Sequence, residues 1–237
     1  LAPSEIRTLE AKLIAQGMAP KGVELVHTVI SGAYRYALQD DLVWRNPAKA
    51  VTPPPVIHTE VVPPEIAIVK EILRFAEEEN HPLSACLYLI AYTGLRRGEA
   101  LGLRHQDLNL EAGVISIVQT VGRSLHKGVI IEPTKTTYSR RSVDLDDDTV
   151  AVLRAHMGKQ MLHRMELEGA YEDHGLVFPN GLGRPMNPMT LTRAFQSFAK
   201  RLGLQGAKVH DLRHFHASVM LQNGESLLLV RKRLGHA

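Results

Sequence analysis

The segment VTPPPVIHTEVVPP, which begins at Val51, constrains the fold of this chain more than any other stretch. Its prolines are Pro53, Pro54, Pro55, Pro63 and Pro64. Proline fixes the backbone angle φ and has no backbone N–H to donate, so such a run interrupts a helix and favours an extended connector. We therefore predict an interdomain linker at residues 51–63, with a separate domain on either side.

The residues before this linker, 1–50, carry two helical patterns, at residues 3–16 and 21–38. A segment of this length buries too little apolar surface to be stable by itself. We interpret it as the C-terminal part of a larger helical domain.

The residues after the linker, 64–237, are predicted to be mostly helical. Helical patterns recur there at residues 65–79, 84–92, 96–103, 147–168, 188–202, 210–222 and 226–234. Three short segments rich in Val and Ile lie among them, GVISIVQTV, KGVIIEPT and SRRSVDL, and turn residues separate the three. These segments indicate a sheet. The expected fold class is mostly α with a small three-stranded antiparallel sheet (α+β).

The number of cysteines and the length of the apolar stretches indicate the cellular compartment of this chain. Cys86 is its single cysteine, so an intrachain disulfide is excluded. No apolar stretch is long enough to read as a membrane span. We therefore expect a cytoplasmic protein with no membrane partner.

The charge of the chain is distributed unevenly along its length. The net charge is only +3, but basic residues predominate from Arg193 onward. A second basic block consists of Arg123, Lys127, Lys135, Arg140 and Arg141. Such asymmetry suits a polyanion partner, and solvated surface charge is the alternative interpretation.

Four polar motifs occur in order after the linker. TGLRRGEALGL places Arg96 and Glu99 three residues apart, a spacing that lets them pair on one face of a helix. PTKTTYSRRSVDL places Lys135 in a turn between two predicted strands. HDLRHFHASVM contains the pair His210 and Arg213, and RLGHA contains His236. A histidine three residues before an arginine suggests a site that holds an anion.

Together these motifs resemble the catalytic domain of the tyrosine recombinases, in their phage integrase branch, over nearly all of residues 64–237. The segment Trp44–Pro47 also resembles the end of the family's core-binding domain. The resemblance therefore implies that residues 1–50 are the C-terminal part of a helical core-binding (DNA-binding) domain. Residues 51–63 would then be the interdomain linker, and residues 64–237 the catalytic domain.

The resemblance implies a site-specific DNA recombinase that cleaves and rejoins DNA through a 3′-phosphotyrosyl intermediate. Its role would be the integration or excision of phage or mobile-element DNA. Arg96 and Arg213 would clamp the non-bridging phosphate oxygens, because a planar guanidinium binds such oxygens in bidentate fashion. Glu99 would orient these arginines. No cofactor or metal is expected, since the arginines supply the positive charge that Mg²⁺ provides in many nucleases.

Three further residues complete the site that the resemblance implies. Lys135 would protonate the leaving 5′-oxygen. His210 would contact a phosphate oxygen or accept the tyrosine proton, since histidine can do either near neutral pH. His236 would donate a hydrogen bond to the phosphate.

The implied partners are duplex attachment-site DNA and sister protomers in a homotetrameric synaptic complex. The resemblance also admits accessory DNA-bending and directionality factors. Five basic residues around the site are predicted to contact DNA, namely Arg123, Lys127, Arg140, Arg141 and Arg193.

One element of the family pattern, the nucleophilic tyrosine, is not found. No tyrosine of this sequence follows the LGH motif, so we expect the chain as it stands to bind DNA without cleaving it. Two alternatives on a similar scaffold are a type IB topoisomerase-like enzyme and a non-catalytic DNA-binding protein. A third alternative is a zinc site at His210 and His214, which share a helical face and have His216 close by; it would need a third ligand from a histidine, a cysteine or a carboxylate.

Overall fold

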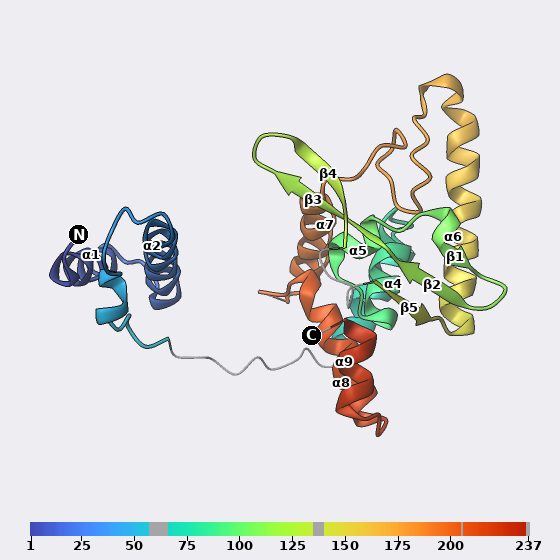
Figure 1. The fold of residues 1–237 in the computed structure, drawn as a ribbon. Helices are drawn as coiled ribbons and strands as arrows, with labels where there is room; N and C mark the ends of the chain where they lie inside the picture. Colours follow the sequence, from blue (N-terminus) through green and yellow to red (C-terminus); the bar gives the residue numbers. More distant parts are fainter. Residues whose placement is uncertain (57–65, 135–139, 205, 236–237) are drawn as a thin grey trace. The chain divides into compact units, whose positions relative to one another are not determined.

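The computed structural model describes residues 1–56, 66–134, 140–204 and 206–235. The chain divides into two compact units, Leu1–Val61 and Val62–Ala237 (Figure 1). Two of the predicted site residues, Lys135 and His236, lie outside the described residues.

The first unit consists of helices α1 (Pro3–Ala15) and α2 (Pro20–Gln39) and the short 3₁₀ helix η1 (Pro47–Ala50). Each begins with a proline, which is favoured in the first helical turn because its fixed φ suits a helix and no N–H is needed there. Ile6, Ala48 and Val51 form a small buried cluster, against which Ile30 packs. Both predicted helices of this unit are confirmed.

The second unit is built around α4 (Ser84–Thr93), whose Cys86, Leu87, Leu89, Ile90 and Ala91 are all at most 1% exposed. Helices pack around it because its sides are apolar. The other helices are α3 (Ile66–Glu78), α5 (Arg97–Leu101), α6 (Asp147–Glu166), α7 (Pro188–Arg201), α8 (Val209–Gln222) and α9 (Leu227–Leu234), with 3₁₀ turns η2 (His105–Asp107) and η4 (Glu168–Ala170).

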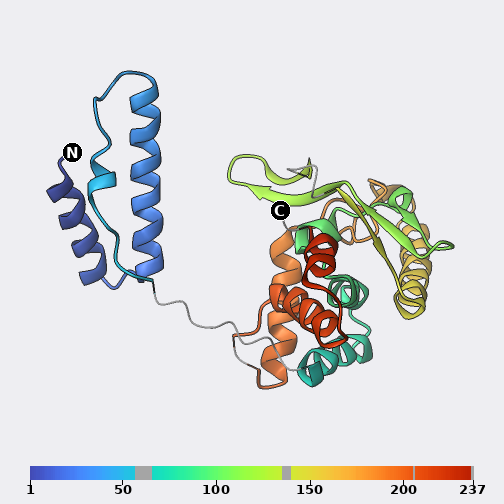
Figure 2. The same ribbon diagram turned by 60° about the horizontal axis from the view of Figure 1, so that its bottom comes forward.

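These helices confirm the predicted helical segments of the second unit, with ends that differ by a few residues. Helix α8 lies against α4 and is followed by α9, while α6 covers another side of α4 (Figures 1 and 2). Within the described part of the chain, no helix combines the length and the apolar character needed to cross a membrane.

The strands form two separate antiparallel sheets. β1 (Leu108–Asn109), β2 (Val114–Ile117) and β5 (Arg141–Asp144) make a three-stranded sheet in the order β1-β2-β5. β3 (Gln119–Ser124) and β4 (Gly128–Pro133) form a hairpin of their own.

A small three-stranded antiparallel sheet is confirmed, but the three predicted segments do not all belong to it, since β4 (from KGVIIEPT) lies in the hairpin and β1 is the third strand. The segment GVISIVQTV breaks at Val118 into β2 and β3. Its first half pairs with β5, where Ile115 faces Val143, and its second half pairs with β4, where Val121 faces Ile131. KGVIIEPT and SRRSVDL both have the composition of a strand. The sequence alone therefore could not show which half of GVISIVQTV each would pair with.

Gly98 of α5 and Gly102, which caps the end of that helix, set its position against the hairpin. Gly98 and Gly102 are four residues apart and so share one face of the helix. A Cβ on Gly98 would lie 2.6 Å from the carbonyl oxygen of Val121, and one on Gly102 would lie 3.0 Å from that of Gln119. The side-chain amide of Gln119 also donates to the Gly102 carbonyl, at 2.8 Å. Helix α5 therefore lies directly on the backbone of β3.

We expect Gly98→Ala to destabilise the protein by about 1–3 kcal/mol, because the added methyl group would push α5 away from β3. The matched control is Gly158→Ala within α6, where an added Cβ meets no atom within 4 Å. This control should instead stabilise the protein by about 0.5–1 kcal/mol. Urea unfolding of both variants would measure the difference, and equal shifts of the same sign would contradict the close approach.

Candidate functional site

Arg96 stands at the start of α5 and is held by Glu99. Helix α4 ends at Gly94, which adopts a left-handed φ of 67°, and the chain turns there into α5. The Glu99 carboxylate accepts hydrogen bonds from the Arg96 backbone N–H at 2.9 Å and from its Nη1 at 2.8 Å. The predicted pair is thus present, although Arg96 caps the helix rather than lying within it. The Arg96 side chain is 41% exposed, whereas Glu99 is buried.

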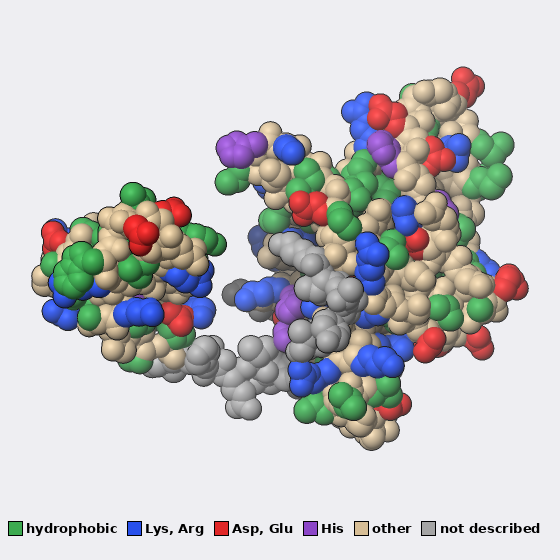
Figure 3. Space-filling view, viewed as in Figure 1, with side chains coloured by type: hydrophobic (Ala, Val, Ile, Leu, Met, Phe, Trp, Pro, Cys, Tyr) green, Lys and Arg blue, Asp and Glu red, His purple; other side chains and the backbone are tan. Residues whose placement is uncertain are grey.

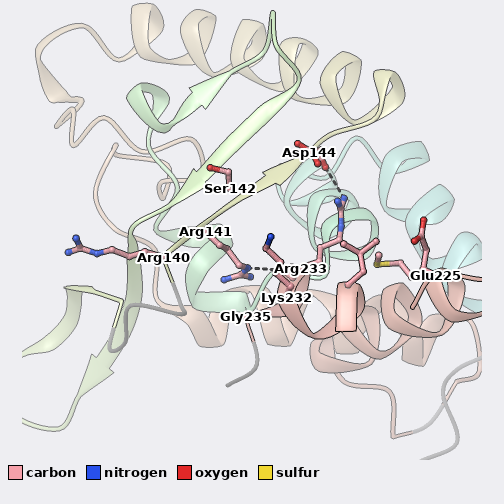
Figure 4. A pocket seen from close by; sticks show the side chains of 10 residues that line it. Arg140, Arg141, Ser142, Asp144, Glu225, Lys232, Arg233 and Gly235 are labelled. Carbon is pink, nitrogen blue, oxygen red and sulfur yellow. Dashed lines mark hydrogen bonds between the residues drawn. The ribbon is translucent and has the colours of Figure 1, made fainter. Parts of the chain in front are cut away.

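Arg141, at the start of β5, holds the same carboxylate from the other side. Its Nη2 lies 2.9 Å from Glu99 Oε2, and its Nε donates to the carbonyl of Arg233 at 2.7 Å (Figure 4). The Arg141 side chain is only 8% exposed. This placement differs from the predicted DNA contact, because the guanidinium points into the protein and is engaged there.

The Glu99 carboxyl is ionised in spite of its burial. Burial alone would raise its pKa, but the hydrogen bond and charge of Arg141, followed by the hydrogen bonds from Arg96, bring the pKa below its ordinary value. The carboxylate therefore carries a full negative charge between two guanidiniums.

Arg213 lies beneath this pair, on α8, and is 3% exposed. It donates from Nη1 to the Gly94 carbonyl and from Nη2 to the Leu234 carbonyl, both at 2.6 Å. Burial, and then the nearby charge of Arg96, lower its pKa to about 10. It therefore remains positively charged at neutral pH.

The three arginines converge on the end of α9. Arg141 donates to the carbonyl of Arg233, Arg213 to that of Leu234, and Arg96 Nη2 to that of Gly235 at 3.2 Å. The last carbonyls of a helix lack partners within the helix and carry the negative end of its dipole, so cations suit them. The carbonyl groups accept hydrogen bonds from the guanidinium N–H groups, but they carry no net charge and so do not neutralise the arginines. Three guanidiniums and one carboxylate leave the cluster with a net positive charge.

His210, in the first turn of α8, lies near the edge of this cluster. Partial burial, followed by the charges of His214 and Arg213, lowers its pKa below the ordinary value. His210 is thus predominantly neutral at pH 7 and can accept a proton. Its ring stands edge-on to His214, with centroids 4.7 Å apart. Among the residues that the structure describes, no group of three or more His, Cys, Asp or Glu side chains is arranged to hold a metal ion.

His216 and Arg233 were not among the predicted site residues, yet both help to fix α9. The buried His216 accepts a hydrogen bond at Nε2 from Arg233 Nε, at 3.1 Å. Arg233 also donates to the Asp144 carbonyl of β5 at 2.8 Å. Burial, and then the charge of Arg233, lower the pKa of His216 to about 4. The basic run before the LGH motif was the available sequence signal for Arg233.

The remaining predicted DNA contacts are exposed. Arg123 and Lys127 lie close together at the tip of the β3–β4 hairpin, Arg193 is on α7, and Arg140 precedes β5. Lys and Arg side chains are spread over the face of the second unit that carries the hairpin (Figure 3). A groove of about 740 Å³ opens beside β5 and α9, lined in part by Arg140 and Lys232.

Comparisons with known proteins place this site in context. The model of the family described as "Phage integrase family" matches residues 67–237. The chain is 28% identical over 255 residues to a "Tyrosine recombinase XerC-like" protein of Caldanaerobacter subterraneus subsp. tengcongensis, with 98% of this chain covered. It spans 63% of the length of that relative.

Solved structures with the same fold are found as well. A structure of the Tn1549 transposon integrase in complex with a circular intermediate DNA has a TM-score of 0.81 at 18% identity, covering 100% of this chain and 78% of that one. A lambda integrase tetramer bound to a Holliday junction has a TM-score of 0.65 at 20% identity, covering 100% of this chain and 62% of that one.

The low pKa of His216 predicts a loss of stability in acid. Its folded-state pKa, about 4, is below the ordinary value of 6.5, so the unfolded chain binds a proton first. This contribution is complete above pH 6.5 and is lost as the pH falls towards 4, at up to about 1.4 kcal/mol per pH unit.

His216→Gln keeps an acceptor for Arg233 but cannot titrate. Urea unfolding of the parent and this variant between pH 7 and pH 5 measures the difference, since the other titrating groups are common to both. The parent should lose more free energy of unfolding, by on the order of 1 kcal/mol. Parallel curves would show that His216 does not titrate in this way.

Proposed function

The chain belongs to the phage integrase family, and we propose that it provides the DNA-cleavage site of a site-specific tyrosine recombinase. The protein would cleave and rejoin DNA through a 3′-phosphotyrosyl intermediate, during integration or excision of phage or mobile-element DNA. The relatives named above support this role, since they include a transposon integrase in complex with DNA. We place the activity in the cytoplasm of a bacterial host.

The observation that carries this proposal is the convergence of Arg96 and Arg213 on the end of α9, together with Arg141 and the Glu99 carboxylate that joins Arg96 to Arg141. In the transition state of phosphoryl transfer, negative charge gathers on the non-bridging oxygens. A preorganised cationic site stabilises that charge without reorganising during the reaction. Arg96 is the exposed member, so its guanidinium would contact the phosphate directly. Arg213 would add charge from beneath, and its planar fork would hold the Gly94 and Leu234 carbonyls, which a lysine could not do.

The proposed reaction forms one bond to phosphorus and breaks another. A tyrosine oxygen attacks the phosphorus, and the bond from phosphorus to the 5′-oxygen breaks as the 3′-phosphotyrosyl bond forms. We propose that the tyrosine lies beyond His236 in the full-length protein. Neutral His210 would take its proton or hold a phosphate oxygen, and His236 would donate a hydrogen bond to the phosphate. Lys135 would protonate the leaving 5′-oxygen.

DNA recognition on this proposal uses the exposed basic residues of the second unit. Arg123 and Lys127 of the hairpin tip, together with Arg140 and Arg193, would contact phosphates, which position the duplex without reading its sequence. Residues 1–50 would contribute part of a core-binding domain, joined through the linker at residues 51–63. Four protomers would assemble on two attachment sites, as in the lambda integrase tetramer on a Holliday junction.

We expect this chain to bind duplex DNA with strong salt dependence. Each phosphate contact contributes about −0.9 to the slope of log affinity against log salt concentration, because bound counterions are released. Arg140→Ala should make that slope shallower by about one contact. The control Arg154→Ala, on the exposed side of α6 and paired with Glu111, should leave the slope unchanged. Affinity that does not change from low to moderate salt would contradict the proposal.

Loss of either central arginine should impair cleavage more than binding. In the full-length protein, Arg96→Ala or Arg213→Ala should slow formation of the covalent adduct on a nicked substrate by on the order of 10²-fold or more. Binding should fall far less, because other phosphate contacts remain.

Arg213 is buried, so Arg213→Lys provides a second variant that keeps the charge but lacks the planar fork. The control is Arg97→Ala, which removes only the contact of Arg97 with Thr192 and Met189 on α7. It should cleave at close to the parent rate. Cleavage by Arg213→Lys at that rate would refute the assignment.

A further inference from the structure

We propose that Arg141 is a positioning residue of the DNA-cleavage site rather than one of its phosphate ligands. Arg141 would hold Glu99, and through Glu99 the guanidinium of Arg96, in a fixed relation to the end of α9. This inference rests on the function proposed above. It assigns Arg141 a role different from that of its neighbour Arg140, although both are basic residues of one segment.

The two neighbouring arginines point in opposite directions. Arg140 is exposed, whereas the Arg141 side chain is 8% exposed and points towards α9 (Figure 4). Arg140 lies just before β5, whereas Arg141 is the first residue of that strand. Arg141 is the residue paired with Ile117 of β2, and this register turns its side chain towards Glu99.

Among the residues that the structure describes, Arg141 supplies two of the four hydrogen bonds to Glu99. Two come from Arg96, through its backbone N–H and Nη1, and two come from Nη1 and Nη2 of Arg141. A buried carboxylate that loses such donors tends to bind a proton. Protonated Glu99 would lose its ion pair with Arg96 and would accept weaker hydrogen bonds from it, since only the donor would still be charged. Loss of Arg141 would therefore loosen Arg96 indirectly, through Glu99.

The other side of the Arg141 guanidinium lies against the end of α9. Its Nε binds the Arg233 carbonyl, and a Cβ on Gly235 would lie only 3.0 Å from its Nη1 and 3.2 Å from its Cζ. Gly235 also has a left-handed φ of 66°. The glycine of the LGH motif thus lets the backbone at the end of α9 lie against the Arg141 guanidinium.

The test compares Arg141→Ala and Arg141→Lys with Arg140→Ala in the full-length protein. DNA affinity is measured over a range of salt concentrations, and the cleavage rate is measured at saturating nicked DNA. Both Arg141 variants should keep the parent salt slope and lose 10-fold or more in cleavage rate. Arg140→Ala should reduce the slope by about 0.9, as a phosphate contact does. If Arg141→Ala does not fold, Arg141→Lys decides the test, because lysine retains the positive charge but lacks the planar guanidinium fork.

A double variant tests whether Arg141 acts through Glu99. Glu99→Gln combined with Arg141→Lys should cleave little more slowly than the slower single variant, because both changes disrupt one interaction. If the double variant instead loses cleavage rate by the product of the two single losses, the inference is overturned. A salt slope reduced in the Arg141 variants, or a cleavage rate equal to that of the parent, would overturn it as well.

A measurement that needs no activity separates this inference from the proposed function. If the full-length parent forms no covalent adduct with DNA, the proposed function fails. Amide hydrogen exchange in the present chain then decides whether Arg141 holds α9. Arg141→Lys should speed exchange of the Gly235 amide, which is bonded to the Lys232 carbonyl in the last turn of α9. Unchanged exchange there would overturn the inference.

Discussion

The buried carboxylate of Glu99 is the group on which the arrangement of the site depends. Burying a carboxylate is costly unless donors surround it, and Arg96 and Arg141 provide them from two different elements. Glu99 in turn keeps two like-charged guanidiniums close together and fixes the direction of each. The cluster is therefore ordered by the protein itself and does not need a ligand to assemble it, which is the condition for electrostatic preorganisation.

The glycines of TGLRRGEALGL supply the spacing that this cluster requires. Gly94, Gly98 and Gly102 recur every four residues. At Gly94 an added Cβ would lie 2.7 Å from the ring of His216, and Gly98 and Gly102 lie against the backbone of β3. One short segment thus carries Arg96 and Glu99 and also the small residues that let α4, α5, α8 and β3 approach one another.

Sequence patterns predicted the helices well and the sheet only in part. The predicted helices are present because apolar periodicity and capping act within one element. The three predicted strand segments do not form one sheet, because nothing local shows that GVISIVQTV divides at Val118 between two different partners. The predicted roles of Arg140 and Arg141 were the same, since nothing in two adjacent arginines shows which one turns inward. The structure separates them by exposure, and His216 with Arg233 adds a contact that no motif indicated.

The sequence by itself determined the helices and the order of the motifs, because these depend on residues that are near neighbours in the chain. Only the tertiary structure decided which charges are buried together. Glu99 and Arg141 are 42 residues apart, and Arg141 and Arg233 are 92 apart. Whether such side chains meet depends on how helices and strands pack over long separations, and the stability of a buried ion pair depends on the full set of donors around it.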